Sequence, residues 1–412
     1  MENIELINNK KINNENKILG LYIHIPFCVA KCSYCDFLSS PCDEHTKFAY
    51  YQALLNEIQL QGKLYGLKGT NRRISTIFFG GGTPSILNSD YICGIMDTIK
   101  DSFCLMENAE ISIECNPGTL SQEKLLKYKS CGINRISIGL QTANNHELKA
   151  IGRIHTYEQF LESYNMTLEA GFSNVNIDLM SALPYQTISS YEETLNKVLA
   201  LNPTHISAYS LILEEGTPLF DYISNDHYSI LPDEDTDRNM YYLTKEKLAK
   251  YGYERYEISN YSKPGFECKH NLSYWQGIDY LGLGLGSSSY IDRKRFKNIS
   301  NLNDYISIFN KTNANISEII CDEITLSDID LMEEFMYLGL RKTSGVSIKS
   351  FYNLFKKDLL QVFNEPLSKY QSLGLLSIID DTITLTERGL DVSNTIFADF
   401  LLEDTDEINQ YN

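Results

Sequence analysis

Strand-like runs alternate with helix-like stretches six times before residue 252 of this chain. The apolar runs are Leu21–Ile25, Ile74–Phe79, Glu110–Glu114, Arg135–Leu140, Asn174–Met180 and His205–Leu211, and the helical stretches lie around 45–66, 89–103, 121–130, 156–170, 189–201 and 237–251. Strands that are separated by helices pair in parallel through right-handed crossovers. The pattern therefore predicts an α/β fold, an incomplete TIM-like (β/α)6 barrel, with its functional residues at the carboxyl ends of the strands.

The composition changes after about residue 300. The segment Asn298–Ser317 is rich in Asn, Ser and Thr, which is typical of a connector. After it, helical patterns at 325–341, 347–355 and 364–373 precede two strand-like runs, Leu375–Ile379 and Thr382–Leu385. We expect a disordered lead at 1–17, the barrel at 18–300, a connector at 301–320, a helical, winged-helix-like domain at 321–402 and an acidic tail at 403–412.

The charge of the chain excludes one class of partner. Lys and Arg number 36 against 54 Asp and Glu, which gives a net charge of −18. Binding to phosphate backbones needs a positive face, so we expect no nucleic-acid partner and assign the C-terminal domain a lid or packing role. No uncharged apolar run of about 18 residues, signal peptide or transit peptide is found, so we expect a cytoplasmic protein without a transmembrane segment.

Three cysteines, Cys28, Cys32 and Cys35, follow the first strand-like run with the spacing C-x3-C-x2-C. Three thiolates in one loop can bind three irons of a [4Fe–4S] cluster and leave the fourth iron open to another ligand. A structural zinc site, the alternative, needs four ligands, usually as two paired hooks. The next cysteine, Cys42, follows Pro41 in a polar loop, so we favour the cluster and interpret Cys42 as a surface thiol.

The cysteine spacing and the phrase Tyr22-Ile23-His24-Ile25-Pro26-Phe27-Cys28 resemble one family of radical S-adenosylmethionine (SAM) proteins. This is the oxygen-independent coproporphyrinogen III oxidase family, whose members include the HemW-type haem chaperones. The resemblance extends from residue 18 to about residue 400. It implies that the amino and carboxylate groups of SAM chelate the open iron. It also implies that an electron from the cluster can cleave SAM to a 5′-deoxyadenosyl radical.

The run Gly80-Gly81-Gly82-Thr83 follows the second predicted strand and matches the GGTP element of the family. Glycines let a ligand approach the backbone closely and leave N–H groups free for a carboxylate. Polar side chains recur at the other strand ends, where a barrel places its active site. The resemblance implies that SAM is bound by Tyr22, Tyr34, Gly81, Gly82, Thr83, Glu114, Gln141, Arg153 and Asp178. We interpret His24 as a core histidine without a catalytic role.

The segment His270-Asn271-Leu272-Ser273-Tyr274-Trp275 matches the H-N-x-x-Y-W motif of the HemW-type branch. Imidazole is a suitable ligand for haem iron, and aromatic rings can cover a porphyrin face. His270, Tyr274 and Trp275 are therefore candidate haem residues, and a packed turn with a buried tryptophan is the alternative. The oxidases carry a fourth cysteine two residues after the third, where this chain has Phe37.

Two functions follow from this resemblance. The first is a haem chaperone that binds haem as cargo and delivers it to a haem-accepting client, with respiratory haem proteins as typical clients and peripheral contact with membrane-bound ones. The alternative is an oxygen-independent coproporphyrinogen III oxidase of porphyrin biosynthesis. Both imply a small electron donor such as flavodoxin or ferredoxin. The sequence assigns no catalytic residue and leaves open whether the protein is an enzyme.

Overall fold

The computed structural model describes residues 17–67, 69–70, 72–225, 227–311 and 313–402. The expected lead, apart from Lys17, and the expected acidic tail lie outside the described residues. The described part contains two large hydrophobic cores, one built from residues between 19 and 319 and one from residues between 332 and 400. Each core belongs to its own sheet, so the chain forms two structural units.

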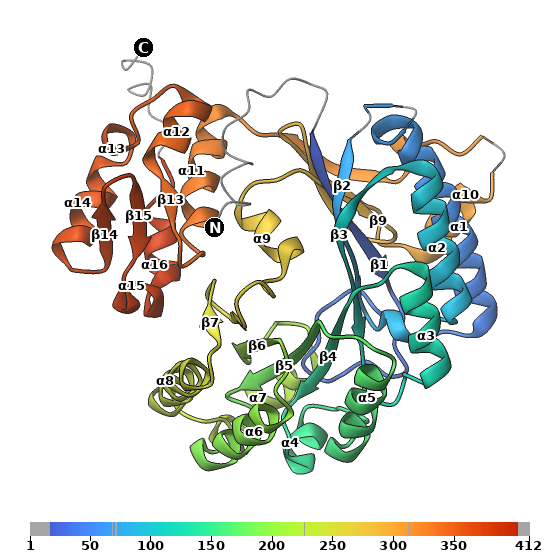
Figure 1. The fold of residues 1–412 in the computed structure, drawn as a ribbon, viewed down its shortest axis with the longest axis horizontal. Helices are drawn as coiled ribbons and strands as arrows, with labels where there is room; N and C mark the ends of the chain where they lie inside the picture. Colours follow the sequence, from blue (N-terminus) through green and yellow to red (C-terminus); the bar gives the residue numbers. More distant parts are fainter. Residues whose placement is uncertain (1–16, 68, 71, 226, 312, 403–412) are drawn as a thin grey trace.

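Six parallel strands form the centre of the first unit. They are β1 (Ile18–Ile25), β2 (Arg73–Gly81), β3 (Cys104–Cys115), β4 (Arg135–Gln141), β5 (Val175–Ser181) and β6 (His205–Ser210), paired in sequence order. The sheet curves strongly but stays open on the side that faces the C-terminal unit (Figure 1). The predicted α/β partial barrel is confirmed.

Helices cover the convex face of this sheet. They are α1 (Glu44–Tyr65), α2 (Ser89–Ser102), α3 (Gln122–Cys131), α4 (Asn145–Ala150), α5 (Tyr157–Glu169), α6 (Ile188–Leu201), α7 (Pro218–Ser224) and α8 (Glu234–Lys250), with short 3-10 turns at Pro84–Ile86 and Tyr228–Ile230. Most begin at a side chain that accepts a backbone N–H, such as Asp43 before α1 and Ser121 before α3. These caps satisfy N–H groups that a helix start otherwise leaves unpaired.

The sheet is larger than the sequence predicts, with 12 strands. Beyond β1 lie β9 (Tyr280–Leu283), β10 (Ser288–Ile291), β11 (Lys294–Asn298) and β12 (Ile320–Thr325), and beyond β6 lie β8 (Asn260–Ser262) and β7 (Glu254–Arg255). Apart from β9, which runs parallel to β1, these added strands pair antiparallel. They are two to six residues long, too short for a clear alternation of polar and apolar residues.

The expected connector at 301–320 carries regular structure. It contains α10 (Leu302–Phe309) and a 3-10 turn at Ile316–Glu318, and β12 continues the large sheet to Thr325. Tyr305 and Phe309 of α10 are buried in the first core, and the Tyr305 hydroxyl donates to Glu57 of α1. The sheet therefore extends past the expected domain start at residue 321, because β12 pairs with β11.

The second unit is a small α/β module. Its helices are α11 (Asp328–Gly339), α12 (Ile348–Phe355), α13 (Leu359–Val362), α14 (Asn364–Ser372), α15 (Glu387–Asp391) and α16 (Ser393–Ala398), and its strands are β13 (Val346–Ser347), β14 (Leu376–Ile379) and β15 (Thr382–Leu385), in the order β13-β15-β14. The β14–β15 hairpin after the helices matches the predicted wing. Between this unit and the barrel lies the short helix α9 (Lys269–Trp275), as Figure 1 shows.

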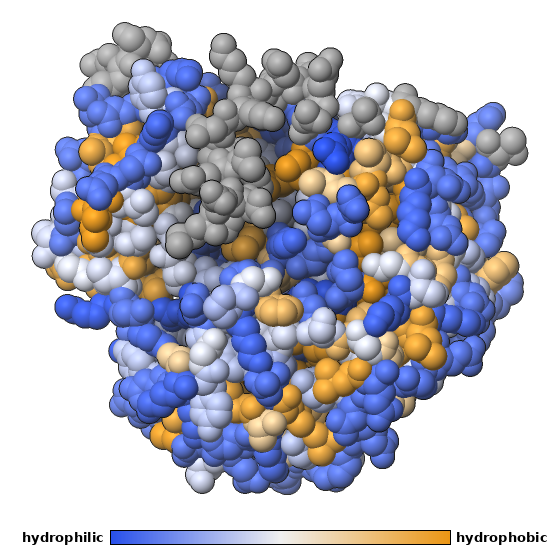
Figure 2. All heavy atoms as spheres, in the orientation of Figure 1, coloured by the Kyte–Doolittle hydropathy of each residue, from blue (hydrophilic) through white to orange (hydrophobic). Residues whose placement is uncertain are grey.

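The surface in the orientation of Figure 1 is mostly hydrophilic, with separate hydrophobic patches, as Figure 2 shows. Among the described residues, no helix has the length and apolar composition that a membrane span requires. The excess of acidic residues thus belongs to a solvated surface that surrounds the two cores.

Candidate functional site

A cavity of about 400 Å³ opens where the strands β1 to β6 end. All the predicted cluster and SAM residues except Tyr22 line it: Cys28, Cys32, Tyr34, Cys35, Gly81, Gly82, Thr83, Glu114, Gln141, Arg153 and Asp178. The first and the last of these residues are more than 140 positions apart in the sequence. The parallel sheet brings them together because all its strand ends lie at one edge. The sequence-based grouping of these residues therefore corresponds to one place in the fold.

The cysteine loop leaves β1 and is held by backbone hydrogen bonds between Cys28 N and Ser40 O (3.3 Å) and between Ser40 N and Pro26 O (3.0 Å). Arg153 points its Nη1 at Cys32 Sγ (3.7 Å), and the Thr83 hydroxyl points at Cys28 Sγ (3.5 Å). The guanidinium and the hydroxyl thus place hydrogen-bond donors beside two of the three sulfur atoms.

The loop fits an iron–sulfur cluster better than a single ion. Among the described residues, no three Cys, His, Asp or Glu side chains are arranged to hold one metal ion, although the three cysteines line the same cavity. A cluster requires such spread thiolates, because each binds a different iron. Gly82 lies against the loop: a Cβ there would be 2.9 Å from Cys28 Sγ and 2.6 Å from Phe27 O. The separation of the three cysteines in one cavity is what favours the cluster over a single zinc ion.

Cys42 does not line the cavity. Its side chain is half-buried and packs against the first core, so it is less exposed than a surface thiol. Burial raises the pKa of the Cys42 thiol, as it raises that of Cys35, so the position outside the cavity is what separates Cys42 from the cluster cysteines.

Gly81 and His24 form one wall of the site. Gly81 has φ +114°, and a Cβ on it would lie 2.7 Å from the His24 ring. The His24 ring is bonded at both nitrogens, with Nδ1 3.1 Å from the Tyr22 hydroxyl and Nε2 2.9 Å from Leu38 O. His24 is therefore a satisfied buried histidine, and any side chain at Gly81 displaces it before it meets a ligand.

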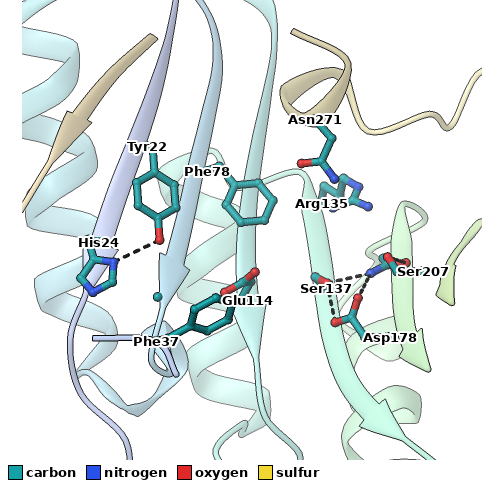
Figure 3. Close-up of a pocket in the computed structure, with 12 residues that line it drawn as sticks. Tyr22, His24, Phe37, Phe78, Glu114, Arg135, Ser137, Asp178, Ser207 and Asn271 are labelled. Carbon is teal, nitrogen blue, oxygen red and sulfur yellow. Dashed lines mark hydrogen bonds between the residues drawn. The ribbon is translucent and has the colours of Figure 1, made fainter. Parts of the chain in front are cut away.

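Two carboxyl groups, Glu114 on β3 and Asp178 on β5, face the same cavity (Figure 3). Burial, and then the negative charge of Asp178, raises the pKa of Glu114 to about 8. Burial also raises the pKa of Asp178, although its carboxylate accepts hydrogen bonds from Ser137 Oγ (3.1 Å) and Asn176 Nδ2 (2.7 Å). Glu114 is therefore largely protonated at neutral pH. A cationic group on a ligand would lower this pKa and favour the ionised carboxylate.

The opposite rim is held by a network around Gln141. This residue ends β4 in the left-handed region (φ 73°), which is uncommon for a residue with a side chain and is enriched at functional sites. Its Oε1 accepts from the Tyr209 hydroxyl (3.3 Å). Next to it, Arg153 Nη2 donates to Gly139 O (2.6 Å) and Asn116 Oδ1 (2.8 Å), so the guanidinium that reaches Cys32 is fixed in place.

A second cavity of about 280 Å³ continues inside the curved sheet and shares Gly81, Glu114, Ser137 and Asp178 with the first. Tyr22 lines this one, and so do residues that the sequence analysis did not single out: Phe78, Arg135, Ser137, Asn176, Ser207 and Asn271. The sequence of β4 does contain a signal for this polar interior. Polar or small residues occupy every second position of β4, namely Arg135, Ser137, Gly139 and Gln141, whereas the inside of a packed barrel is mostly branched and apolar.

Helix α9 carries the candidate haem residues, and none of the three lines either cavity. His270 is 1% exposed, stacks on Phe78 at 5.1 Å, and has Nδ1 2.8 Å from Thr76 Oγ1 and Nε2 2.9 Å from the Tyr274 hydroxyl. Burial, and then the charge of Arg135, lowers the pKa of His270 to about 3, so the ring is neutral. Both nitrogens are engaged, so this imidazole would have to break a hydrogen bond to bind an iron.

Trp275 lies at the junction of the two units. The Arg341 guanidinium sits 4.4 Å from the centre of its ring, and its indole N–H has no hydrogen-bond partner among the described residues. The start of α9 is fixed by Glu110, whose carboxylate accepts from the backbone N–H groups of Lys269 and His270 (both 3.1 Å). The motif thus joins the barrel to the C-terminal unit.

The sequence matches two family models: residues 22–198 match the radical SAM superfamily and residues 326–392 match the HemN C-terminal domain. "Heme chaperone HemW" of Lactococcus lactis is 37% identical over 93% of this chain and 97% of its own length. The protein of the same name from Bacillus subtilis is 36% identical over 93% and 99%. This chain belongs to the HemW family of radical SAM proteins.

The HemW family shares its fold with a known oxidase. The solved coproporphyrinogen III oxidase HemN of Escherichia coli, described as a radical SAM enzyme, has a TM-score of 0.81 to this chain. It is 25% identical and aligns over 94% of this chain and 91% of its own. The HemW sequences are therefore the more similar relatives, and the oxidase shares the architecture.

Proposed function

We propose that this protein is a haem chaperone that binds a [4Fe–4S] cluster, SAM and haem, and that it passes haem to a haem-accepting client. The observation that carries the proposal is the joint occurrence of the three-cysteine cavity and the His270–Trp275 motif in a chain of the HemW family. Cys28, Cys32 and Cys35 would hold the cluster. With SAM on its open iron, the cluster would supply one-electron chemistry. Respiratory haem proteins and a flavodoxin- or ferredoxin-like donor remain predicted partners, in the cytoplasm.

The chain's own residues support binding of SAM at this edge of the sheet. Glu114 and Asp178 offer acceptors for ammonium or hydroxyl groups at this cavity. The expectation that the glycine run leaves free N–H groups is wrong, because Gly82 N donates to Ile25 O (2.9 Å), Thr83 N donates to Phe27 O (2.8 Å) and the Gly81 backbone donates to Glu114. Arg153 keeps its charge beside Cys32. Roles of Tyr34, Thr83 and Gln141 toward SAM are proposals that rest on their common cavity and on the family resemblance. The role of Tyr22, which lines the neighbouring cavity, rests on the resemblance and on the residues that the two cavities share.

Haem binding is assigned to the neighbourhood of α9. His270, Tyr274 and Trp275 remain the candidate residues, and the hydrogen bonds of His270 give it a second role, which is to hold the helix against β2. An iron would compete with Thr76 and Tyr274 for this imidazole. A Soret spectrum of the haem-loaded protein therefore reports whether His270 ligates the iron or only positions the helix.

Oxidase activity is the second candidate function, because the HemN fold matches over most of the chain. Phe37 argues against it: it is 61% exposed at the cavity, where the oxidases have a cysteine. We expect no protoporphyrinogen when the reconstituted protein is incubated anaerobically with SAM, a reductant and coproporphyrinogen III. Sustained turnover would replace the chaperone proposal by the oxidase.

The raised pKa of Glu114 predicts a pH dependence of SAM binding. Below pH 8 the carboxyl is mostly protonated, and a bound sulfonium or ammonium group favours ionisation. Affinity should therefore rise with pH up to about 8, by at most about tenfold per unit. Calorimetric titration with SAM between pH 6 and 8 measures this change in affinity. Glu114→Gln should flatten the profile and Asp178→Asn should shift the rise to lower pH; an unchanged profile in Glu114→Gln contradicts the assignment.

A further inference from the structure

The inside of the curved sheet is polar, and its side chains lie in layers. Strand pairing places Tyr22, Phe78, Ser112 and Arg135 in one layer across β1 to β4, and Glu114 and Ser137 lie in the next layer toward the strand ends. A closed, packed barrel fills such layers with branched apolar residues. Of these six residues, all except Ser112 line the 280 Å³ cavity here. Figure 3 draws the five on their neighbouring strands.

Arg135 is the unexplained group in this cavity. It is 2% exposed and lines the cavity, yet its guanidinium has no hydrogen bond to any described residue, and Nε is buried without a partner. No described carboxylate oxygen lies within 4.0 Å of the Arg135 guanidinium, which is the limit for an ion pair. Buried arginines normally meet a carboxylate or phosphate in paired, charge-assisted hydrogen bonds, because desolvating an unpaired charge is costly.

The nearest carboxylates are used elsewhere. Glu110 accepts the backbone N–H groups at the start of α9, and Asp178 accepts from Ser137 and Asn176. Burial lowers the pKa of Arg135, but the charges of Cys268, Glu110, Tyr256 and Asp178 together raise it. The guanidinium is thus held as a cation near these groups, without a hydrogen bond to a described residue.

Asn271 provides a second donor that faces the same cavity. It belongs to α9, lines the same cavity, and its side-chain amide has no hydrogen bond to a described residue. Arg135 and Asn271 therefore present a buried cation and a neutral donor from two separate elements, β4 and α9. Together they form an acceptor-binding pair of the kind that recognises a carboxylate.

We propose that Arg135 and Asn271 bind a carboxylate group of a small-molecule ligand inside the sheet, in the layer that contains Tyr22 and one layer below Glu114. The proposal deepens the proposed function, because haem carries two propionate side chains, but the anion site itself rests on Arg135. Two inward positions, Ser137 and Gly139, lie between Arg135 and Gln141, which are about 20 Å apart along β4. The site is therefore separate from the cysteine loop.

The test of the anion site uses propionate as the probe. The reconstituted, SAM-saturated protein is melted in sodium propionate and in sodium chloride of equal ionic strength. We expect propionate to raise the melting temperature of the wild type by about 1–3 °C over chloride. Arg135→Gln should abolish the difference, and Arg135→Lys should keep part of it. Asn271→Ala serves as the second variant if Arg135→Gln does not fold.

A second measurement compares haem with its dimethyl ester, which lacks the two carboxylates. We expect the ester to bind the wild type roughly 10- to 100-fold more weakly, the loss typical of one charge-assisted pair, and to bind Arg135→Gln as well as haem does. An equal ester penalty in both proteins contradicts the role of Arg135 while leaving haem binding intact.

The remaining outcomes are distinguishable. If haem does not bind at all, the chaperone proposal fails, and the propionate measurement alone decides the anion site. If propionate stabilises only the SAM-free protein, the guanidinium belongs to the SAM site and the proposal is overturned. If propionate acts no differently from chloride on the wild type, no carboxylate site exists at Arg135.

Discussion

Cys32→Ala should abolish the brown absorbance of the anaerobically reconstituted protein and reduce its iron from about four atoms per chain to nearly none. Cys32 is the cysteine that Arg153 contacts, and it lines the cavity with Cys28 and Cys35. Losing one of three thiolates leaves two irons without a protein ligand. Iron and sulfide analysis together with the visible spectrum measures the effect.

Cys42→Ala is the matched control, because Cys42 lies in the same region of the chain but outside the cavity. It should keep full iron content and an unchanged spectrum. Equal loss of iron in the two variants would contradict the three-thiolate assignment and support a four-cysteine site.

His270→Ala should destabilise the barrel and weaken haem binding while the cluster still assembles. The ring fills a fully buried position between Phe78 and Tyr274 and satisfies the Thr76 hydroxyl. Its removal leaves a void and two unpaired hydroxyl groups, which together cost about 2–4 kcal/mol of unfolding free energy. Denaturant unfolding measures the stability, and haem titration followed at the Soret band measures the affinity.

Lys269→Ala is the control on the same helix, because Lys269 is exposed and only its backbone N–H is used by Glu110. It should leave stability and haem affinity at wild-type values. Trp275→Ala should weaken haem binding less than His270→Ala does. If His270→Ala binds haem with the wild-type affinity and spectrum, the histidine is structural and the haem site must lie elsewhere.

The sequence predicted the strand ends well for a physical reason. Long parallel strands alternate with long helices, so their periodicity is readable, and the topology forces their carboxyl ends together. Glu114, Gln141 and Asp178 could therefore be placed in one site before any coordinates were known.

The short elements were not predictable in the same way. Strands β9 to β12 owe their existence to pairing with residues far along the chain rather than to local preference. Helix α10 lies in a segment rich in Asn, Ser and Thr, and its signal is only the spacing of Tyr305 and Phe309, which face the core.

Burial of polar residues also depends on distant partners. The buried ring of His270 shares a hydrogen bond with the Thr76 hydroxyl, 194 residues earlier, and no local sequence pattern indicates that contact. Arg135 is the first residue of the predicted strand Arg135–Leu140, but the sequence does not show that its side chain is buried inside the curved sheet. The sequence identified the motif and the strand, but the direction of each side chain followed from the tertiary fold.

Transfer of haem tests the central claim most directly. The reconstituted protein is loaded with one equivalent of haem, freed of excess, and mixed anaerobically with an apo-form haem acceptor such as apomyoglobin. We expect the Soret spectrum to convert to that of the acceptor. A variant that binds haem weakly, such as His270→Ala, should deliver less haem. A wild-type protein that fails to bind haem, or that retains it in the presence of excess acceptor, would contradict the account.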